Sequence, residues 1–223
     1  MQYYIGKEEN YYINVREDLI SLLPNNSQQR VLEIGAGGGD TLVAIKERQL
    51  AIEVIGVDLF SLNNTNQTNS QIDQFLIADI EKDDLPFLNG YFDVIICGDV
   101  LEHLVDPWLA VEKLSNYLKQ GGSFIISVPN IRNYRALFNI VFKGTFAYDP
   151  SGGIMDKTHL RFFCRKNVSD LFHNSIFLVK DVLPITRFSK YRFSKKVEIF
   201  NFLTFNLLEE FLVSQYLGVA IRK

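Results

Sequence analysis

Short, continuously apolar runs alternate along most of this chain with segments in which apolar residues recur at helical spacing. Runs without polar alternation are typical of parallel strands that are buried on both faces of a sheet. They predict strands at 30–34, 52–57, 75–78, 92–97 and 123–128. The periodic segments predict helices at 15–23, capped by Asn14 and ended by Pro24, and at about 40–49, 107–119 and 131–143. The alternation predicts an α/β fold around a mostly parallel sheet.

Two other stretches depart from this alternation. Residues 61–74 are rich in Asn, Gln, Ser and Thr, which predicts a loop or a weak helix between the second and third strands. In the last quarter, a strand at 177–182 is followed by a basic and aromatic stretch at 186–196. After it we predict an apolar helix at about 197–212 and a final strand at 215–221.

The chain shows no internal repeat and no linker composition, so we predict one domain over 1–223. Within it we expect an N-terminal helix or lid (1–29) and a cofactor-binding core (30–130). The remainder (131–223) is expected to supply acceptor-side elements and the closing strands.

The sharpest local feature is the glycine-rich run from Glu33 to Asp40, directly after a predicted strand and before a predicted helix. Glycines allow a tight turn and the close approach of a ligand. The dinucleotide fingerprint G-x-G-x-x-G needs its third glycine where Asp40 stands, and a carboxylate there would repel a pyrophosphate. Glu33, two residues before Gly35, instead suits a ligand with a cationic amino-acid end. A bare tight turn is the alternative.

Acidic residues follow the next two predicted strands. Asp58 lies about 20 residues beyond the glycine loop, where an acid in a Rossmann-like unit accepts hydrogen bonds from ribose hydroxyls. Asp79 follows the third strand, where it is placed to meet the exocyclic amine of an adenine while Ile80 packs on the ring. A role for Asp79 in capping a turn is the alternative.

Several segments taken together resemble a known family. They are VLEIGAGGGD (31–40), VIGVDL (54–59), IADIE (77–81), YFDVIICGDVLEHLVDPW (91–108) and LKQGGSFIISVPN (118–130). Their order and spacing resemble the successive motifs of class I S-adenosylmethionine-dependent methyltransferases over about 30–130. QYLGVAIRK (215–223) is similar to the family's closing strand.

The resemblance implies a Rossmann-like, seven-stranded, mostly parallel sheet with an antiparallel last strand, helices on both faces, and S-adenosylmethionine as cofactor. It implies cofactor contacts from Glu33, Gly35, Ala36 and Gly37 around the methionine part, Asp58 and Leu59 at the ribose, and Asp79 and Ile80 at the adenine. Asp99, after the fourth strand, is implied to line the cofactor or acceptor side.

Residues 127–133, 144–148 and 153–163 resemble a bacterial subgroup that is associated with surface-glycan biosynthesis. This implies O-methylation of a sugar hydroxyl on a small-molecule or lipid-linked acceptor. Cys164 departs from the subgroup, where a Thr or Ser is expected to cap the next helix. Four alternatives stay open: a small-molecule acceptor such as a quinone precursor, methylation of nitrogen or carbon, a non-catalytic scaffold with this fold, and an NAD-dependent oxidoreductase.

Methyl transfer to a hydroxyl benefits from a general base, and histidine is the usual one. We predict that His159 is the base, because it lies in a polar segment on the expected acceptor side, with Arg161 or Asp156 orienting it or the substrate. His103, close to the cofactor motifs, is the second candidate. For both histidines a purely structural role is the alternative.

The composition of the chain narrows the class of protein and the partners that it can bind. The chain is 47% hydrophobic and 22% charged with a net charge of −3, typical of a soluble globular protein without a general attraction to nucleic acid. Its two cysteines predict neither a disulfide framework nor a metal site. No run suits a signal peptide or a membrane span, so we predict a cytoplasmic protein. Peripheral membrane contact through 186–208 is a further hypothesis, against a solvated loop and a core helix, and the oligomeric state stays open.

Overall fold

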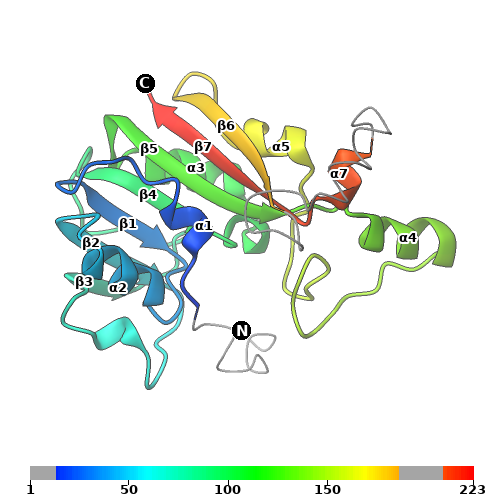
Figure 1. The fold of residues 1–223 in the computed structure, drawn as a ribbon, viewed down its shortest axis with the longest axis horizontal. Helices are drawn as coiled ribbons and strands as arrows, with labels where there is room; N and C mark the ends of the chain where they lie inside the picture. The colour runs from blue at the N-terminus through cyan, green and yellow to red at the C-terminus, as the bar shows by residue number, and fades with distance from the viewer. Residues whose placement is uncertain (1–13, 186–207) are drawn as a thin grey trace.

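A seven-stranded sheet forms the centre of the computed structural model, which describes residues 14–185 and 208–223 (Figure 1). The strand order is β3-β2-β1-β4-β5-β7-β6. The strands are β1 (Arg30–Ile34), β2 (Glu53–Asp58), β3 (Gln74–Ile77), β4 (Phe92–Gly98), β5 (Leu118–Pro129), β6 (Phe177–Ile185) and β7 (Gln215–Arg222). Neighbours among β1 to β5 pair in parallel, and β7 is antiparallel to both β5 and β6. The predicted mostly parallel sheet with an antiparallel last strand is confirmed.

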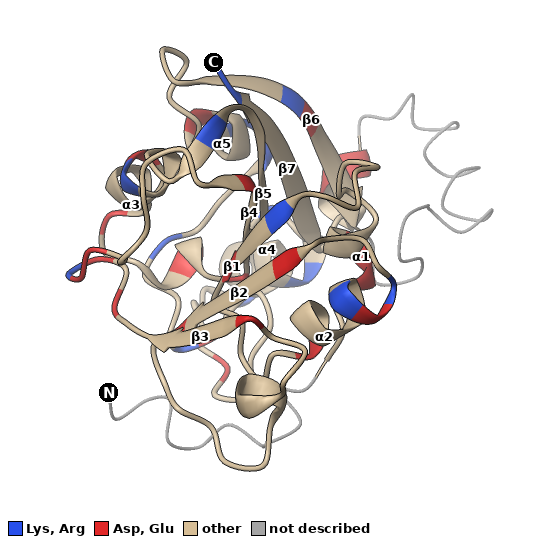
Figure 2. Ribbon diagram, turned by 90° about the vertical axis from the view of Figure 1, so that its left-hand side faces the viewer, with Lys and Arg blue, Asp and Glu red and all other residues tan. Residues whose placement is uncertain are grey.

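Two apolar cores form because successive residues of a strand point to opposite faces. Val31 and Val94 lie in one buried cluster, with residues of α1 (Glu17–Ile20) and α2 (Asp40–Glu47). Their neighbours Leu32 and Ile95 lie in the other, with residues of α3 (Pro107–Ser115) and α5 (Arg165–Asp170). Figure 2 shows these helix pairs on opposite sides of the sheet. The expected helices on both faces are therefore present.

Side-chain caps define where the later helices begin. The Asp106 side chain accepts from the Leu109 N–H at 3.0 Å at the start of α3. Asn133 caps α4 (Tyr134–Lys143) by accepting from the Arg135 N–H at 3.1 Å. At α5 the Cys164 N–H donates to Asn167 Oδ1 at 3.1 Å, so Asn167 supports the start of a helix where the sequence lacks the expected Thr or Ser.

The first predicted helix is shorter than expected. α1 spans Glu17–Ile20 and its N-cap is Arg16, so the prediction of a helix over 15–23 capped by Asn14 is wrong. Beyond Ile20 the chain tightens, because the N–H groups of Leu22 and Leu23 bond to carbonyls three residues earlier.

The fifth strand begins earlier than its apolar run. β5 starts at Leu118, which pairs with Phe92, and the helix predicted to reach residue 119 ends at Ser115. Gly121 has a φ of +76°, a conformation that glycine adopts readily. A register shift in the β4–β5 ladder accompanies it. Gly121 and Gly122, which come just before the predicted strand at 123–128, therefore lie within β5.

The polar segment 61–74 contains one short 3₁₀ turn, η2 (Asn66–Thr68), and η3 (Leu101–His103) follows β4. In the last quarter the structure describes α7 (Glu209–Leu212) between β6 and β7. The predicted basic stretch, the helix before residue 208 and all but the last residue of the proposed membrane contact through 186–208 lie outside the described residues. No helix within 14–185 or 208–223 is long and apolar enough to span a bilayer.

Candidate active site

A cavity of about 380 Å³ opens where β1, β2, β3 and β4 end. The carboxyl ends of parallel strands are the usual ligand site of such sheets, and this volume lies in the range of small-molecule sites. All the residues predicted to contact the cofactor line this one cavity: Glu33, Gly35, Ala36, Gly37, Asp58, Leu59, Asp79, Ile80 and Asp99. Asn14, Arg16 and His103 line it as well.

The glycine loop closes tightly over the end of β2. Gly35 has a φ of +70°, and a Cβ there would lie 2.2 Å from the Val100 side chain, so any larger residue would disturb the turn. The Gly35 N–H donates to the Val57 carbonyl at 2.8 Å, and the Gly37 N–H donates to Asp58 Oδ2 at 2.8 Å. The loop and Asp58 therefore hold each other in place.

The polar segment 61–74 supports this loop. Gln67 is buried, and its Nε2 donates to the Gly37 carbonyl at 2.8 Å. Asn66 Nδ2 donates to Asp40 Oδ1 at 3.0 Å. The sequence predicts that the carboxylate of Asp40 repels a pyrophosphate. In the structure Asp40 does not line the cavity, and Asn66 holds its side chain. The amide-rich composition thus serves a loop-bracing role that the sequence did not reveal.

Glu33 is a buried carboxyl at the floor of the site. It is 4% exposed, and among the described residues its Oε2 has no hydrogen-bond partner. Burial raises the pKa of Glu33 to about 8, although the nearby Arg16 charge works in the opposite direction. A buried carboxyl oxygen without a partner is costly and is relieved by a cation or a donor from a ligand. This fits the prediction that the ligand presents a cationic amino-acid end to Glu33.

The two other predicted acids differ in surroundings. Burial raises the pKa of Asp58, while N–H bonds from Phe60 and Gly37 oppose the rise. Asp79 accepts from the Glu81 N–H at 3.0 Å and pairs with Lys82 at 2.5 Å, which lowers its pKa. Asp79 therefore organises a turn, as the alternative held, and also lines the cavity.

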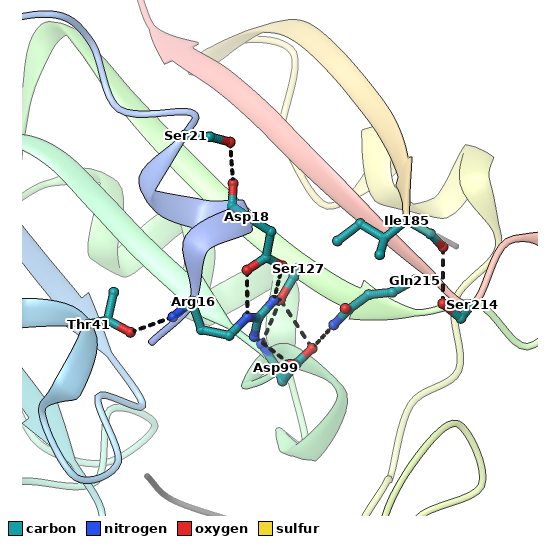
Figure 3. A network of polar contacts seen from close by, with 9 residues as sticks. All are labelled: Arg16, Asp18, Ser21, Thr41, Asp99, Ser127, Ile185, Ser214 and Gln215. Atoms are coloured by element: carbon teal, nitrogen blue, oxygen red, sulfur yellow. Dashed lines mark hydrogen bonds and ion pairs between the residues drawn. The ribbon is translucent and has the colours of Figure 1, made fainter. Parts of the chain in front are cut away.

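Arg16 brings a cation to the cavity that the sequence analysis missed (Figure 3). Its Nη1 bonds to Asp99 Oδ2 at 2.6 Å and its Nη2 to Asp18 Oδ2 at 2.7 Å. Asp99 has a φ of +55°, and its side chain also accepts from the Ser127 hydroxyl and from the Gln215 amide of β7. The network joins the segment before α1 to the ends of β4, β5 and β7, and only the fold brings these parts together.

Of the two candidate bases, His103 is the one that lines the cavity. His103 Nδ1 lies 3.2 Å from the Thr158 carbonyl, and the His103 and His159 rings meet edge to face at 4.8 Å. His159 is 6% exposed, its Nδ1 is 3.1 Å from the Ile154 carbonyl, and its Nε2 is 3.9 Å from Glu102 Oε1. His159 therefore packs beside His103 and is not among the residues that line the cavity.

Arg161 is likewise outside the cavity lining. Its Nε donates to the Val105 carbonyl at 3.1 Å. The N–H groups of Leu160 and Arg161 both donate to the Glu102 carbonyl, at 2.8 and 3.0 Å. The segment that carries His159 and Arg161 is thus bonded to the η3 turn that carries His103.

Glu102 is the most unusual neighbour of these histidines. It is 1% exposed, neither side-chain oxygen has a hydrogen bond within the described chain, and burial raises its pKa well above the ordinary value. Glu102, His103 and His159 each offer a ligand atom, and these atoms lie within 4.8 Å of one another. Such a group is compatible with a metal ion, which the sequence analysis did not expect.

Comparison with known proteins decides the family. A family model described as a methyltransferase domain matches residues 8–176, about three quarters of the chain. The chain is a class I S-adenosylmethionine-dependent methyltransferase. S-adenosylmethionine is its methyl donor, so the NAD-dependent alternative and the scaffold alternative are set aside. The sugar-associated subgroup is not shown by the comparisons.

Curated relatives of the methyltransferase include ubiquinone biosynthesis O-methyltransferases. That of Albidiferax ferrireducens is 28% identical over 159 residues, which cover 65% of this chain and 61% of the relative. That of Coxiella burnetii is 28% identical over 170 residues, covering 64% and 71%. The aligned part thus spans about three fifths of the Albidiferax protein.

Solved structures show the same fold. An S-adenosylmethionine-dependent methyltransferase from Archaeoglobus fulgidus superimposes with a TM-score of 0.61 and 20% identity, over 100% of both chains. One from Mesorhizobium loti gives a TM-score of 0.59 and 16% identity, over 92% of this chain and 95% of that chain. At these identities the likeness concerns architecture only.

The raised pKa of Glu33 predicts how stability depends on pH. The folded chain keeps this proton up to about pH 8, whereas the unfolded chain loses it near 4.5. The folded state then binds more protons in that window, so this group's contribution to stability falls as pH rises from 4.5 to 8. The E33Q variant lacks this loss.

The free energy of unfolding, measured with urea at pH 5, 6.5 and 8 without cofactor, checks this expectation. Between pH 5 and 8, the free energy of unfolding of E33Q should rise relative to that of the wild type by on the order of 1 kcal/mol per pH unit. The exposed Glu112 on α3 provides the control, E112Q, which should follow the wild type. If the free energy of unfolding depended on pH equally in E33Q and the wild type, this would contradict the raised pKa of Glu33.

Proposed function

We propose that this methyltransferase transfers a methyl group to a hydroxyl oxygen of a small-molecule or lipid-linked acceptor, with His103 as general base. The observation that carries the proposal is that His103 lines the same cavity as Glu33, Asp58 and Asp79. A base within reach of the acceptor hydroxyl contributes about 10²- to 10⁴-fold to such a reaction.

The lining residues fit S-adenosylmethionine. Glu33 would receive the ammonium of its methionine part and Arg16 the carboxylate, because both side chains line the cavity and lie close enough for the Arg16 charge to act on the Glu33 carboxyl. Asp58 and Leu59 would hold the ribose, and Asp79 and Ile80 the adenine. When bound, the cofactor supplies a methyl carbon on a positively charged sulfur, which an acceptor oxygen displaces.

The role of His103 follows from its hydrogen bond. With Nδ1–H donating to the Thr158 carbonyl at 3.2 Å, the lone pair lies on Nε2. Nε2 would take the hydroxyl proton as the oxygen–carbon bond forms, and would later release it to water. Most of the remaining acceleration comes from alignment of the two reactants, which is worth about 7–11 kcal/mol.

We assign Glu102, His159 and Arg161 to positioning. The 156–161 segment donates two backbone N–H groups to the Glu102 carbonyl, and Arg161 binds the Val105 carbonyl. These bonds lie on both sides of His103 and fix its turn. The His159 ring at 4.8 Å restricts the orientation of the His103 ring.

A sugar hydroxyl is the acceptor that the resemblance of segments 127–133, 144–148 and 153–163 supports. The names of the curated relatives support a second candidate, a hydroxylated aromatic precursor of a quinone. Both place a weakly acidic hydroxyl next to a histidine base, so the same residues serve either substrate.

An acceptor screen separates the candidates. The full chain is incubated with S-adenosylmethionine and either nucleotide sugars, lipid-linked sugars or dihydroxylated benzoates, and products are identified by mass spectrometry and NMR. A new O-methyl signal in a sugar supports the first acceptor, and one on a ring supports the second. Methylation confined to nitrogen or carbon would contradict the proposal.

A further inference from the structure

One helix of the described chain presents an apolar face to solvent. Along α4, Tyr134, Phe138, Val141 and Phe142 stand at positions i, i+4, i+7 and i+8, which is one face of a helix. They are 44%, 51%, 66% and 76% exposed, whereas Ala136 is buried. Apolar stripes normally face a core, so an exposed one indicates a binding surface. We call these four residues the α4 face.

The charges of α4 indicate what this surface binds. The helix carries Arg135 and Lys143 and no acidic residue, in a chain whose net charge is −3. The Arg135 guanidinium lies 5.6 Å from the Tyr134 ring, and the Lys143 ammonium lies 5.6 Å from the Phe138 ring. Aromatic side chains flanked by cations are typical of helices that lie in the interface of an anionic membrane.

The position of α4 leaves this surface accessible. Figure 1 shows α4 projecting from the end of the sheet, well away from α1 and α2. The chain after it, from Gly144 to Tyr148, is exposed throughout and adds Phe146 and Tyr148, whose rings meet at 5.3 Å. The loop that follows α4 in the chain therefore adds two more exposed aromatic side chains.

Aromatic contacts connect the loop that follows α4 to the cavity. Phe146 packs edge to face on Phe162 at 5.2 Å, and Phe162 packs on His159 at 6.3 Å. His159 in turn packs on His103, which lines the cavity. Ring contacts therefore link the loop that follows the α4 face to the proposed base.

We propose that the α4 face docks this methyltransferase on an anionic phospholipid surface, and that its acceptor is an amphiphile whose apolar part stays in that surface. The substrate class rests on the proposed function, whereas the docking does not. The site lies on α4 and is distinct from the 186–208 stretch suggested by the sequence.

Vesicle flotation of the full chain tests the docking. The wild type should float with phosphatidylglycerol–phosphatidylcholine vesicles and much less with phosphatidylcholine alone. The fraction of the double variant F138S/F142S that floats should be at least about tenfold smaller, because membrane affinity follows the apolar area inserted. The matched control is I52S/L88S, whose side chains are 52% and 76% exposed elsewhere on the surface and which should float like the wild type.

Two readouts separate this proposal from the proposed function. F138S/F142S should keep the wild-type stabilisation by S-adenosylhomocysteine and the wild-type rate on a water-soluble acceptor, because neither residue lines the cavity. Its rate on an acceptor embedded in anionic vesicles should fall with its flotation. Wild-type flotation by F138S/F142S, or no flotation of the wild type, would overturn the docking. A dimer of the wild type that F138S/F142S dissociates would instead show a second copy on the α4 face.

Discussion

The D58N variant is expected to bind S-adenosylhomocysteine about 100-fold more weakly than the wild type. A hydrogen bond to a charged group is worth about 1.5–3 kcal/mol, and about 2.7 kcal/mol corresponds to 100-fold in Kd. The substitution keeps an oxygen that can accept from the Gly37 N–H, now at 2.8 Å from Asp58. The glycine loop should therefore keep its shape, and the loss should reflect the ribose contact.

Isothermal calorimetry of D58N checks this expectation. D84N is the matched control, because the Asp84 side chain is 91% exposed and away from the cavity lining. It should bind like the wild type. A Kd for D58N within about threefold of the wild type would remove Asp58 from the cofactor site, since less than 1 kcal/mol would then be lost.

The H103Q variant is expected to lose turnover while it keeps the cofactor. Loss of a general base lowers kcat by about 10²- to 10⁴-fold. Affinity for S-adenosylhomocysteine should stay within about threefold, because the proposed cofactor contacts come from other residues. H173Q is the control, since His173 is exposed and bonds to the Ser175 hydroxyl at 2.7 Å.

The pH profile of kcat distinguishes a base from a positioning residue. The wild type should lose activity below the pKa of its base, and H103Q should lack that limb. H159Q should be slower than the wild type yet keep the limb, because His103 remains. The reverse pattern, with the limb missing only in H159Q, would restore His159 as the base predicted from the sequence.

The sheet and the cofactor side could be predicted from sequence because local patterns determine both. Continuous apolar runs mark β1, β2 and β4, and the residues directly after such runs gather at one edge of a parallel sheet. Glu33, Asp58 and Asp79 could thus be assigned to one site from the sequence pattern alone. The glycine loop added the backbone turn that brings Gly35 under Val100.

Other parts of the site depend on long-range contacts that no local pattern encodes. Arg16 reaches Asp99, 83 residues away, and Gln67 reaches the Gly37 carbonyl, 30 residues away. His103 and His159 lie in segments of similar polarity, so only the path of the irregular chain from 144 to 163 determines which ring faces the cavity. The sequence therefore indicated both histidines, and the structure adds that His103 lines the cavity whereas His159 does not.

Thermal unfolding with S-adenosylhomocysteine, and with NAD as the comparison ligand, tests most directly that this cavity holds the methyl donor. A ligand at about 100 times its Kd adds about 2.7 kcal/mol, which raises the Tm of a domain of this size by about 5–10 °C. The wild type should show this rise with S-adenosylhomocysteine alone, and D58N should not show it at the same concentration. A rise with NAD, or an equal rise in D58N, would contradict the assignment of the cavity.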